Sequence, residues 1–107
     1  MISKKLIFCH KFIKEIVRDD GHDLSARQMA IFFSIYMDSK IHTVRSLAAE
    51  LNIPKSAVNR AINYLSALHF VRRMPDSTDR RSVIIQKTVK GSIYLDKLAS
   101  RLNEPNK

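Results

Sequence analysis

The segment 54–68 carries polar and basic side chains on one side, in a pattern that suits contact with DNA bases. If it is helical, its apolar residues Val58, Ile62 and Leu65 fall together on one face. The opposite face then carries Lys55, Ser56, Asn59, Arg60 and Asn63. Arginine and lysine can pair with guanine, asparagine with adenine, and serine with either. Because this face has no acidic residue, we predict a recognition helix that enters the major groove of double-stranded DNA.

A second basic cluster follows, in a predicted β-hairpin over residues 70–87. Strands at 70–74 and 83–87 flank a polar loop with turn residues at its start. The arginines of this hairpin are Arg72, Arg73, Arg80 and Arg81. Arginine suits phosphate oxygens and the negative potential of a narrow minor groove, so the hairpin is predicted to be a DNA-binding wing. Asp79 and Asp76 are both candidates for holding Arg81 in place.

The overall charge agrees with a polyanionic partner. The chain has 19 Lys and Arg against 10 Asp and Glu, a formal net charge of +9 over 107 residues. This charge suits nucleic acid or an acidic membrane surface and does not choose between them. The apolar run at 6–9 is interrupted at once by charged residues, which argues against a signal peptide or a membrane span. We therefore expect a cytoplasmic protein.

Other reactive side chains are better explained by structure than by catalysis. Cys9 is the only cysteine, so no intramolecular disulfide can form, and we expect it to be buried as a small hydrophobic residue. His22, Asp23 and Ser25 lie too close in sequence for a catalytic triad, and the serine is expected to cap a helix. Cys9, His10 and His22 have no recognised metal-ligand spacing. We predict no enzymatic activity, no metal and no cofactor.

The elements that must position these residues follow from apolar periodicity and capping signals. We predict helices at 3–18, 25–38, 44–51, 54–68 and 89–103, with a short strand at 41–42. The first should stop at 19–21, and the second should start with a capping box formed by Ser25 and Gln28. Thr43 and Thr88 should cap later helices. The last should have an apolar stripe formed by Val89, Ile93, Leu95, Leu98 and Leu102.

Two short helices joined at 52–54 form a helix-turn-helix, and the hairpin follows it. The fold class is therefore mainly α with a small β-hairpin wing, a winged helix-turn-helix in a single domain over residues 1–107. A polar outer face is ordinary for any amphipathic helix. The tight turn before segment 54–68 and the basic hairpin after it are what favour the DNA-binding interpretation.

From Leu24 to about Leu95 the sequence resembles the MarR family of winged-helix regulators. The resemblance rests on the segments 43–51, 55–60 and 65–73, and above all on the wing pattern Asp-x-Arg followed by Leu-Thr-x-x-Gly. Asp79, Arg81, Thr88 and Gly91 match this pattern, whereas Lys87 replaces its leucine. Pro54 replaces a serine that often precedes the recognition helix, which removes a backbone amide that could have contacted phosphate.

The resemblance implies a bacterial, nucleoid-associated regulator that binds inverted-repeat duplex DNA as a homodimer. Arg81 would enter the minor groove, with Asp79 orienting it. Residues 25–87 would form the DNA-binding core, and the helices within 1–21 and 88–104 would dimerise. The expected dimerisation residues are Phe12, Ile13, Ile16, Leu95, Leu98 and Leu102. Many relatives bind small phenolic or lipophilic effectors near their dimer helices, but we predict no small-molecule effector here.

The alternative is a winged-helix interaction module that binds an acidic protein or RNA, because a fold does not fix its function. The arginines of the wing and the acid-free face of 55–63 weigh against it. A membrane-surface role for helix 3–18 is also disfavoured, because further elements follow it and offer it a packing partner.

Overall fold

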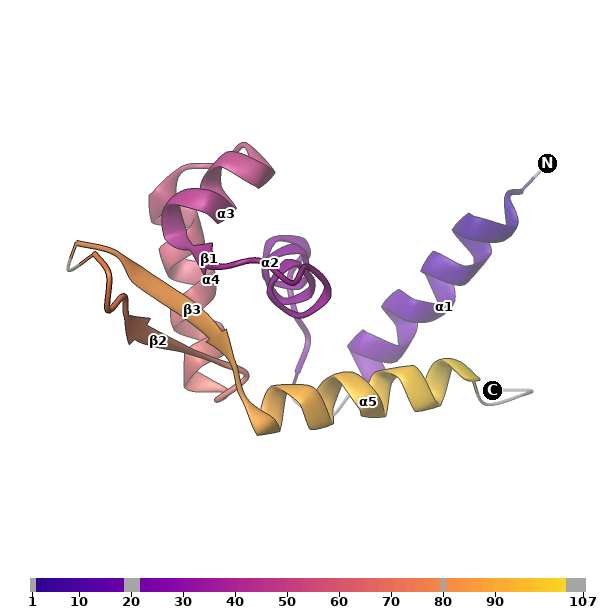
Figure 1. Ribbon diagram of the computed structural model, residues 1–107. Helices are drawn as coiled ribbons and strands as arrows, with labels where there is room; N and C mark the ends of the chain where they lie inside the picture. The colour runs from indigo at the N-terminus through magenta and orange to yellow at the C-terminus, as the bar shows by residue number, and fades with distance from the viewer. Residues whose placement is uncertain (1, 19–21, 80, 104–107) are drawn as a thin grey trace.

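The computed structural model describes residues 2–18, 22–79 and 81–103. These residues form the winged helix-turn-helix expected from the sequence, so the predicted fold class is confirmed (Figure 1). The elements are, in chain order, α1 (Lys4–Arg18), α2 (Ala26–Met37), β1 (His42–Thr43), α3 (Val44–Leu51), α4 (Lys55–Ala67), β2 (Val71–Pro75), β3 (Val83–Lys87) and α5 (Val89–Asn103). The predicted stop at 19–21 and the tail at 104–107 lie outside the described residues.

α2 is the central helix, between the helix-turn-helix on one side and α1 with α5 on the other (Figure 1). Its predicted capping box is present. The Ser25 hydroxyl oxygen accepts a hydrogen bond from the Gln28 amide at 3.2 Å, and the Gln28 side-chain oxygen accepts one from the Ser25 amide at 2.8 Å. Ile31, Phe32 and Ile35 are buried, and they belong to the hydrophobic core to which the other helices and strands also contribute side chains.

The helix-turn-helix is defined at its start and in its turn. The Thr43 hydroxyl oxygen accepts from the Ser46 amide at 3.0 Å, as the predicted cap requires. α3 ends at Leu51, and its C-cap Asn52 has a left-handed backbone with φ of 54°, a conformation that asparagine tolerates. Pro54, with φ of −63°, then directly precedes α4, where its missing N–H is not needed. This turn sets the angle at which α4 leaves α3.

A polar contact attaches α3 to the central helix. The Ser34 hydroxyl of α2 donates to the Glu50 carboxylate of α3 at 2.8 Å, and the Lys40 ammonium lies 3.1 Å from the same carboxylate. The hydrogen bond from Ser34 and then the one from Lys40 hold the pKa of Glu50 below its usual value. The orientation of the helix-turn-helix is thus supported by polar contacts as well as by apolar packing.

The described strands form one antiparallel sheet in the order β1-β3-β2. β3 is the middle strand: Ile85 pairs with His42 of β1 and with Arg73 of β2. The predicted hairpin of β2 and β3 is therefore present, and β1 pairs with the outer edge of β3. Because β1 runs directly into α3, the sheet connects the base of the wing to the helix-turn-helix.

α1 and α5 pack against each other on the far side of α2 (Figure 1). The Lys11 ammonium donates to the Leu102 carbonyl oxygen at 3.1 Å, and the Glu15 carboxylate, largely buried, lies 4.0 Å from the Arg101 guanidinium. Ile16 and Leu98 fill the space between the helices and the core.

The apolar stripe predicted for α5 is wrong at two positions. Val89 and Ile93 are 79% and 61% exposed, whereas Gly91 and Tyr94 are buried. This helix has apolar side chains on more than one face, so periodicity alone could not tell which face would pack. Gly91 and Tyr94 share a face with Leu98, the direction in which the core lies.

Cys9 is exposed on α1, which corrects the expectation that it would be buried. Its neighbours Leu6, Ile7 and Phe8 are also more than half exposed, because only the C-terminal part of α1 reaches the core. None of the helices described is long and apolar enough to cross a membrane.

Candidate nucleic-acid interface

α4 divides into two faces, as the sequence pattern predicts. Val58, Ile62 and Leu65 are all 0% exposed and pack into the core. The polar side chains of the other face are exposed to solvent, and they are Lys55, Ser56, Asn59, Arg60 and Asn63. The inner face fixes the helix, and its outer face carries hydrogen-bond donors and acceptors with no carboxylate among them. Such a surface fits the pattern of donors and acceptors in a major groove.

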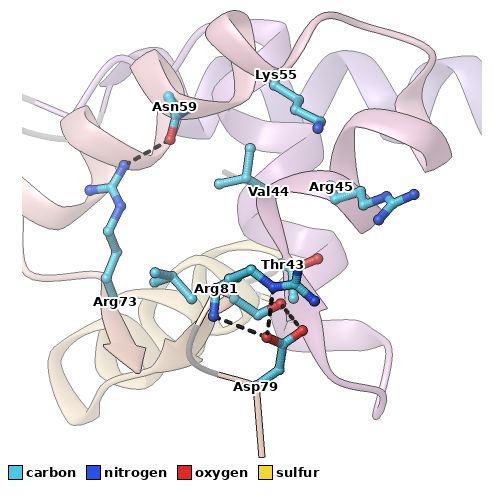
Figure 2. Close-up of a pocket in the computed structure, with 10 residues that line it drawn as sticks. Thr43, Val44, Arg45, Lys55, Asn59, Arg73, Asp79 and Arg81 are labelled. Carbon is cyan, nitrogen blue, oxygen red and sulfur yellow. Dashed lines mark hydrogen bonds and ion pairs between the residues drawn. The ribbon is translucent and has the colours of Figure 1, made fainter. Parts of the chain in front are cut away.

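One outer residue of α4 contacts the wing. The Asn59 side-chain oxygen accepts a hydrogen bond from the Arg73 guanidinium of β2 at 3.3 Å. Figure 2 shows the two side chains pointing toward each other across the gap between α4 and the strand. This bond joins the two parts of the proposed interface, and it occupies one of the two oxygen lone-pair directions of Asn59.

At the wing tip, the two candidate aspartates have different partners. The Asp79 carboxylate accepts from the Arg81 amide at 3.0 Å and lies 3.7 Å from its side-chain Nε. Asp76 instead accepts from the amide and the hydroxyl of Thr78, at 2.9 and 2.7 Å. The bonds from Thr78 hold the pKa of Asp76 below its usual value. Asp79 is therefore the residue in contact with Arg81, whose side chain is 94% exposed.

The structure does not bring all the wing arginines together. Arg73 and Arg81 line the same cleft as α4. Arg72 pairs in register with Gln86 and donates to its side-chain oxygen at 3.3 Å, on the opposite face of the hairpin, because successive strand residues alternate in direction. Arg80 lies outside the described residues.

The cleft between α3, α4 and the wing has a volume of about 530 Å³ (Figure 2). Among the described residues, four cationic side chains line it, and they are Arg45, Lys55, Arg73 and Arg81. Arg45 was missed by the sequence analysis. A signal was present, because a basic residue in the first turn of a helix opposes the positive end of the helix dipole and so suggests an anionic partner.

The base of the wing explains the Thr-x-x-Gly pattern. The Thr88 hydroxyl donates to the His69 carbonyl oxygen at 2.6 Å and accepts from the Gly91 amide at 2.9 Å. A Cβ at Gly91 would overlap the Tyr36 hydroxyl and the carbonyl oxygen of Phe70. The threonine therefore caps α5, and the glycine allows α5 to approach α2 and the start of β2.

The predicted dimerisation residues fall into three groups. Ile16 and Leu98 are each 1% exposed and belong to the core of the protomer. Phe12, Leu95 and Leu102 are half-buried, and they line an apolar groove of about 440 Å³ together with Phe8, Phe33 and Met37. Ile13 is exposed on α1.

The residues weighed for catalysis are used in packing and capping. His22 lies edge-on to the Phe70 and Tyr94 rings, at centroid distances of 5.3 and 5.6 Å. The Ser25 hydroxyl oxygen caps α2. Within the described ranges, no three side chains of His, Cys, Asp or Glu come together as a metal site would need.

Comparison with solved structures gives the same fold. The transcriptional regulator Tm0710 from Thermotoga maritima matches with a TM-score of 0.76 and 27% identity, over 92% of this chain and 68% of that one. A mutant MarR from E. coli, complexed with operator DNA, matches with a TM-score of 0.74 and 19% identity, over 92% and 68% of the two chains. CouR from Rhodococcus jostii RHA1, bound to p-coumaroyl-CoA, matches with a TM-score of 0.70 and 20% identity, over 92% and 67%.

At the level of sequence, no curated protein matches significantly. The model of the MarR family matches residues 22–82, which is more than half of the chain and includes the helix-turn-helix, strand β2 and the Asp-x-Arg motif. The chain therefore belongs to the MarR family of winged helix-turn-helix transcriptional regulators.

Proposed function

We propose that this protein is a sequence-specific regulator that binds an inverted repeat in duplex DNA as a homodimer. In each protomer α4 enters the major groove, and the β2–β3 wing lies at the adjacent minor groove. The observation that carries this proposal is the division of α4 into a fully buried apolar face and an exposed face without acids. The structural relative from E. coli is complexed with operator DNA, which supports the same partner here.

Within this proposal the exposed residues of α4 have separate roles from those of the wing. Arg60 and Asn63 contact base edges, and Lys55 and Ser56, at the start of the helix, contact the backbone or the first base. Arg81, held by Asp79, enters the minor groove, where the phosphates of both strands focus a negative potential. The protein acts in the bacterial cytoplasm, on the nucleoid.

The homodimer rests on apolar surface that a single protomer leaves uncovered. Leu6, Ile7, Phe8, Ile13 and Val17 of α1 are all between 48% and 65% exposed, which is an unusual amount of exposed apolar surface for one helix of a small basic protein. The groove lined by Phe8, Phe12 and Leu95 opens beside them. A second copy of the chain that covers the exposed residues of α1 and the groove would bury this apolar surface, which explains why it is exposed in a single protomer. We propose that α1 and α5 form this interface, and that the groove is filled by the partner rather than by a small-molecule effector.

The test is a selection of duplex DNA from a random library at about 150 mM salt, which suppresses purely electrostatic binding. An enriched inverted repeat is the expected result, with a half-site spacing set by the dimer axis. Enrichment of no sequence, together with binding that disappears as salt rises, would contradict the proposal. It would favour a basic module that binds RNA or an acidic protein.

A further inference from the structure

The side-chain amide of Asn59 is held in one orientation by the wing. Asn59 directly follows Val58, which is 0% exposed, so its backbone is fixed by the buried face of α4 while its own side chain is exposed. Arg73 points toward it from β2 and donates to its Oδ1 at 3.3 Å (Figure 2). Arg73 has no ion pair with any described residue, so no carboxylate among them competes with Asn59 for the guanidinium.

The chemistry of the two groups decides which end of the amide faces the wing. A guanidinium has five N–H donors and no acceptor, whereas a side-chain amide has an acceptor oxygen and a donor nitrogen. Only the oxygen of Asn59 can bond to Arg73, because the opposite orientation would place N–H groups against N–H groups. The amide nitrogen is therefore turned away from Arg73, and it makes no hydrogen bond to any described residue.

Asn63 provides a comparison within the same helix. It lies one turn further along α4, on the same face, and is also exposed. Its side chain makes no hydrogen bond to any described residue, so both its oxygen and its nitrogen are available. Asparagine pairs with adenine by using both groups at once, with the oxygen accepting from N6 and the nitrogen donating to N7. Asn63 is free to form this pair, whereas the oxygen of Asn59 is already bonded to a cation.

We propose that Arg73 is a positioning residue that makes Asn59 a hydrogen-bond donor toward DNA, so that Asn59 selects guanine and not adenine. This inference rests on the proposed function and deepens it, because it assigns a base to one position of the half-site. In the major groove guanine has acceptors at N7 and O6, whereas adenine has a donor amino group in place of O6. The N–H groups of Asn59 match the guanine edge. The positive charge of Arg73 opposes the amino group of adenine.

The wing thus influences base recognition by a helix in the other groove. The general pairing of asparagine with adenine, on which the sequence-based expectation for α4 depends, then applies to Asn63 and not to Asn59.

The first experiment locates the base pair that Asn59 contacts. Duplexes are selected from a random library by the wild-type protein and by Asn59→Ala, both at about 150 mM salt. The position that loses its preference in Asn59→Ala is the one that Asn59 reads. We expect the wild type to select guanine there, by about tenfold over adenine. Any other base at this position, or no position that changes, would overturn the inference and leave sequence-specific binding intact. Enrichment of no sequence by the wild type would instead refute the proposed function, and this inference with it.

The role of Arg73 is tested with four duplexes that differ only at that base pair. In Arg73→Met the Asn59 oxygen is free, so adenine should bind as well as guanine or better. Arg72→Met is the matched control, because it removes the same charge from the adjacent exposed position, where the guanidinium donates to Gln86 and not to α4. Arg72→Met should retain the guanine preference. If Arg73 had only a structural role, Arg73→Met would weaken binding to all four duplexes by the same factor, and that unchanged ratio would overturn the proposal.

A third measurement does not depend on DNA. NMR relaxation of the side-chain amide groups should show Asn59 to be more ordered than Asn63 in the wild type and in Arg72→Met. In Arg73→Met the two amides should be equally mobile. Equal mobility of Asn59 and Asn63 in the wild-type protein would show that Arg73 does not orient Asn59, whatever the selected sequence.

Discussion

The Tyr36 hydroxyl oxygen accepts a hydrogen bond from the backbone amide of Thr88 at 3.0 Å, and the two residues lie 52 positions apart in the sequence. The same hydroxyl donates to the Phe70 carbonyl oxygen at 2.7 Å. Phe70 directly precedes β2, and Thr88 directly follows β3. One phenol of the central helix therefore attaches both ends of the wing, so that the orientation of the wing depends on α2.

Replacing Tyr36 by phenylalanine should lower the free energy of unfolding by about 1–3 kcal/mol, because it leaves two partly buried backbone groups without a partner. Hydrogen exchange of the Thr88 amide should become faster. Tyr64→Phe is the matched control, since the Tyr64 hydroxyl makes no hydrogen bond to any described residue. Equal stability of the two variants in urea would show that the Tyr36 hydroxyl does not hold the wing.

Gly91→Ala should be destabilising for a steric reason. The new methyl group would overlap the Tyr36 hydroxyl and the Phe70 carbonyl oxygen, and moving α5 away would cost about 1–3 kcal/mol. Ser92→Ala, at the next and exposed position, should be nearly neutral. In the double variant with Tyr36→Phe the two losses should be less than additive, because the hydroxyl that overlaps the methyl is absent. Full additivity in thermal or urea unfolding would contradict this contact.

What could be predicted from the sequence was mostly local. The capping box at Ser25 and the helix cap at Thr43 were visible because their partners lie three residues away. The two faces of α4 were visible because only one of them is apolar. The sequence could not show that Val89 and Ile93 would be exposed rather than packed. α5 has apolar residues on several sides, and only the fold decides which of them pack.

The contacts that orient the interface were not visible. Tyr36 looked like one more apolar residue of a buried helix, and its bonds to Phe70 and Thr88 depend on how three elements pack. The bond from Arg73 to Asn59 joins residues that the sequence placed in separate clusters. Arg45 lies in a different element from either cluster, and the cleft brings them together only after folding.

The Glu50 contact should make stability depend on pH in a defined direction. Its pKa in the folded protein is below the ordinary value of 4.5 that holds when the chain is unfolded. The contact therefore stabilises the fold fully above that value, and this contribution is lost as the pH falls toward the folded pKa. Glu50→Gln should cost less than about 1 kcal/mol at pH 7, because the group is partly exposed.

The difference in unfolding free energy between wild type and Glu50→Gln should then shrink from pH 7 to pH 3. Urea titrations at several pH values measure it. A difference that stays constant or grows toward acid would contradict the contacts of Glu50 with Ser34 and Lys40.

Arg60→Ala and Arg81→Ala should weaken DNA binding in different ways. If Arg60 contacts a guanine, its loss should cost about 1–3 kcal/mol on the selected sequence and little on a scrambled duplex. Loss of Arg81 should weaken binding to both duplexes and flatten the salt dependence. Titrations with the two duplexes at several salt concentrations separate these effects. If either variant binds with wild-type affinity at moderate salt, the replaced residue does not belong to the DNA interface.

The homodimer is best tested at Ile13. Leu98 is unsuitable, because it is 1% exposed and a charge there would disrupt the protomer itself. Ile13 is 48% exposed on α1, so Ile13→Glu should leave the fold intact and place a charge in the dimer interface. Lys14→Gln is the matched control, since it changes the net charge by the same unit at the next, exposed position.

In sedimentation, wild type and Lys14→Gln should be dimers and Ile13→Glu a monomer. Binding to an inverted repeat should weaken about 100-fold or more in the monomer, because the second half-site is no longer held at a high effective concentration. Binding to an isolated half-site should not change, since α4 and the wing are untouched. An unchanged mass of Ile13→Glu would exclude α1 from the interface. A monomeric wild type would instead contradict the homodimer, and the exposed apolar residues of α1 would then need a different partner.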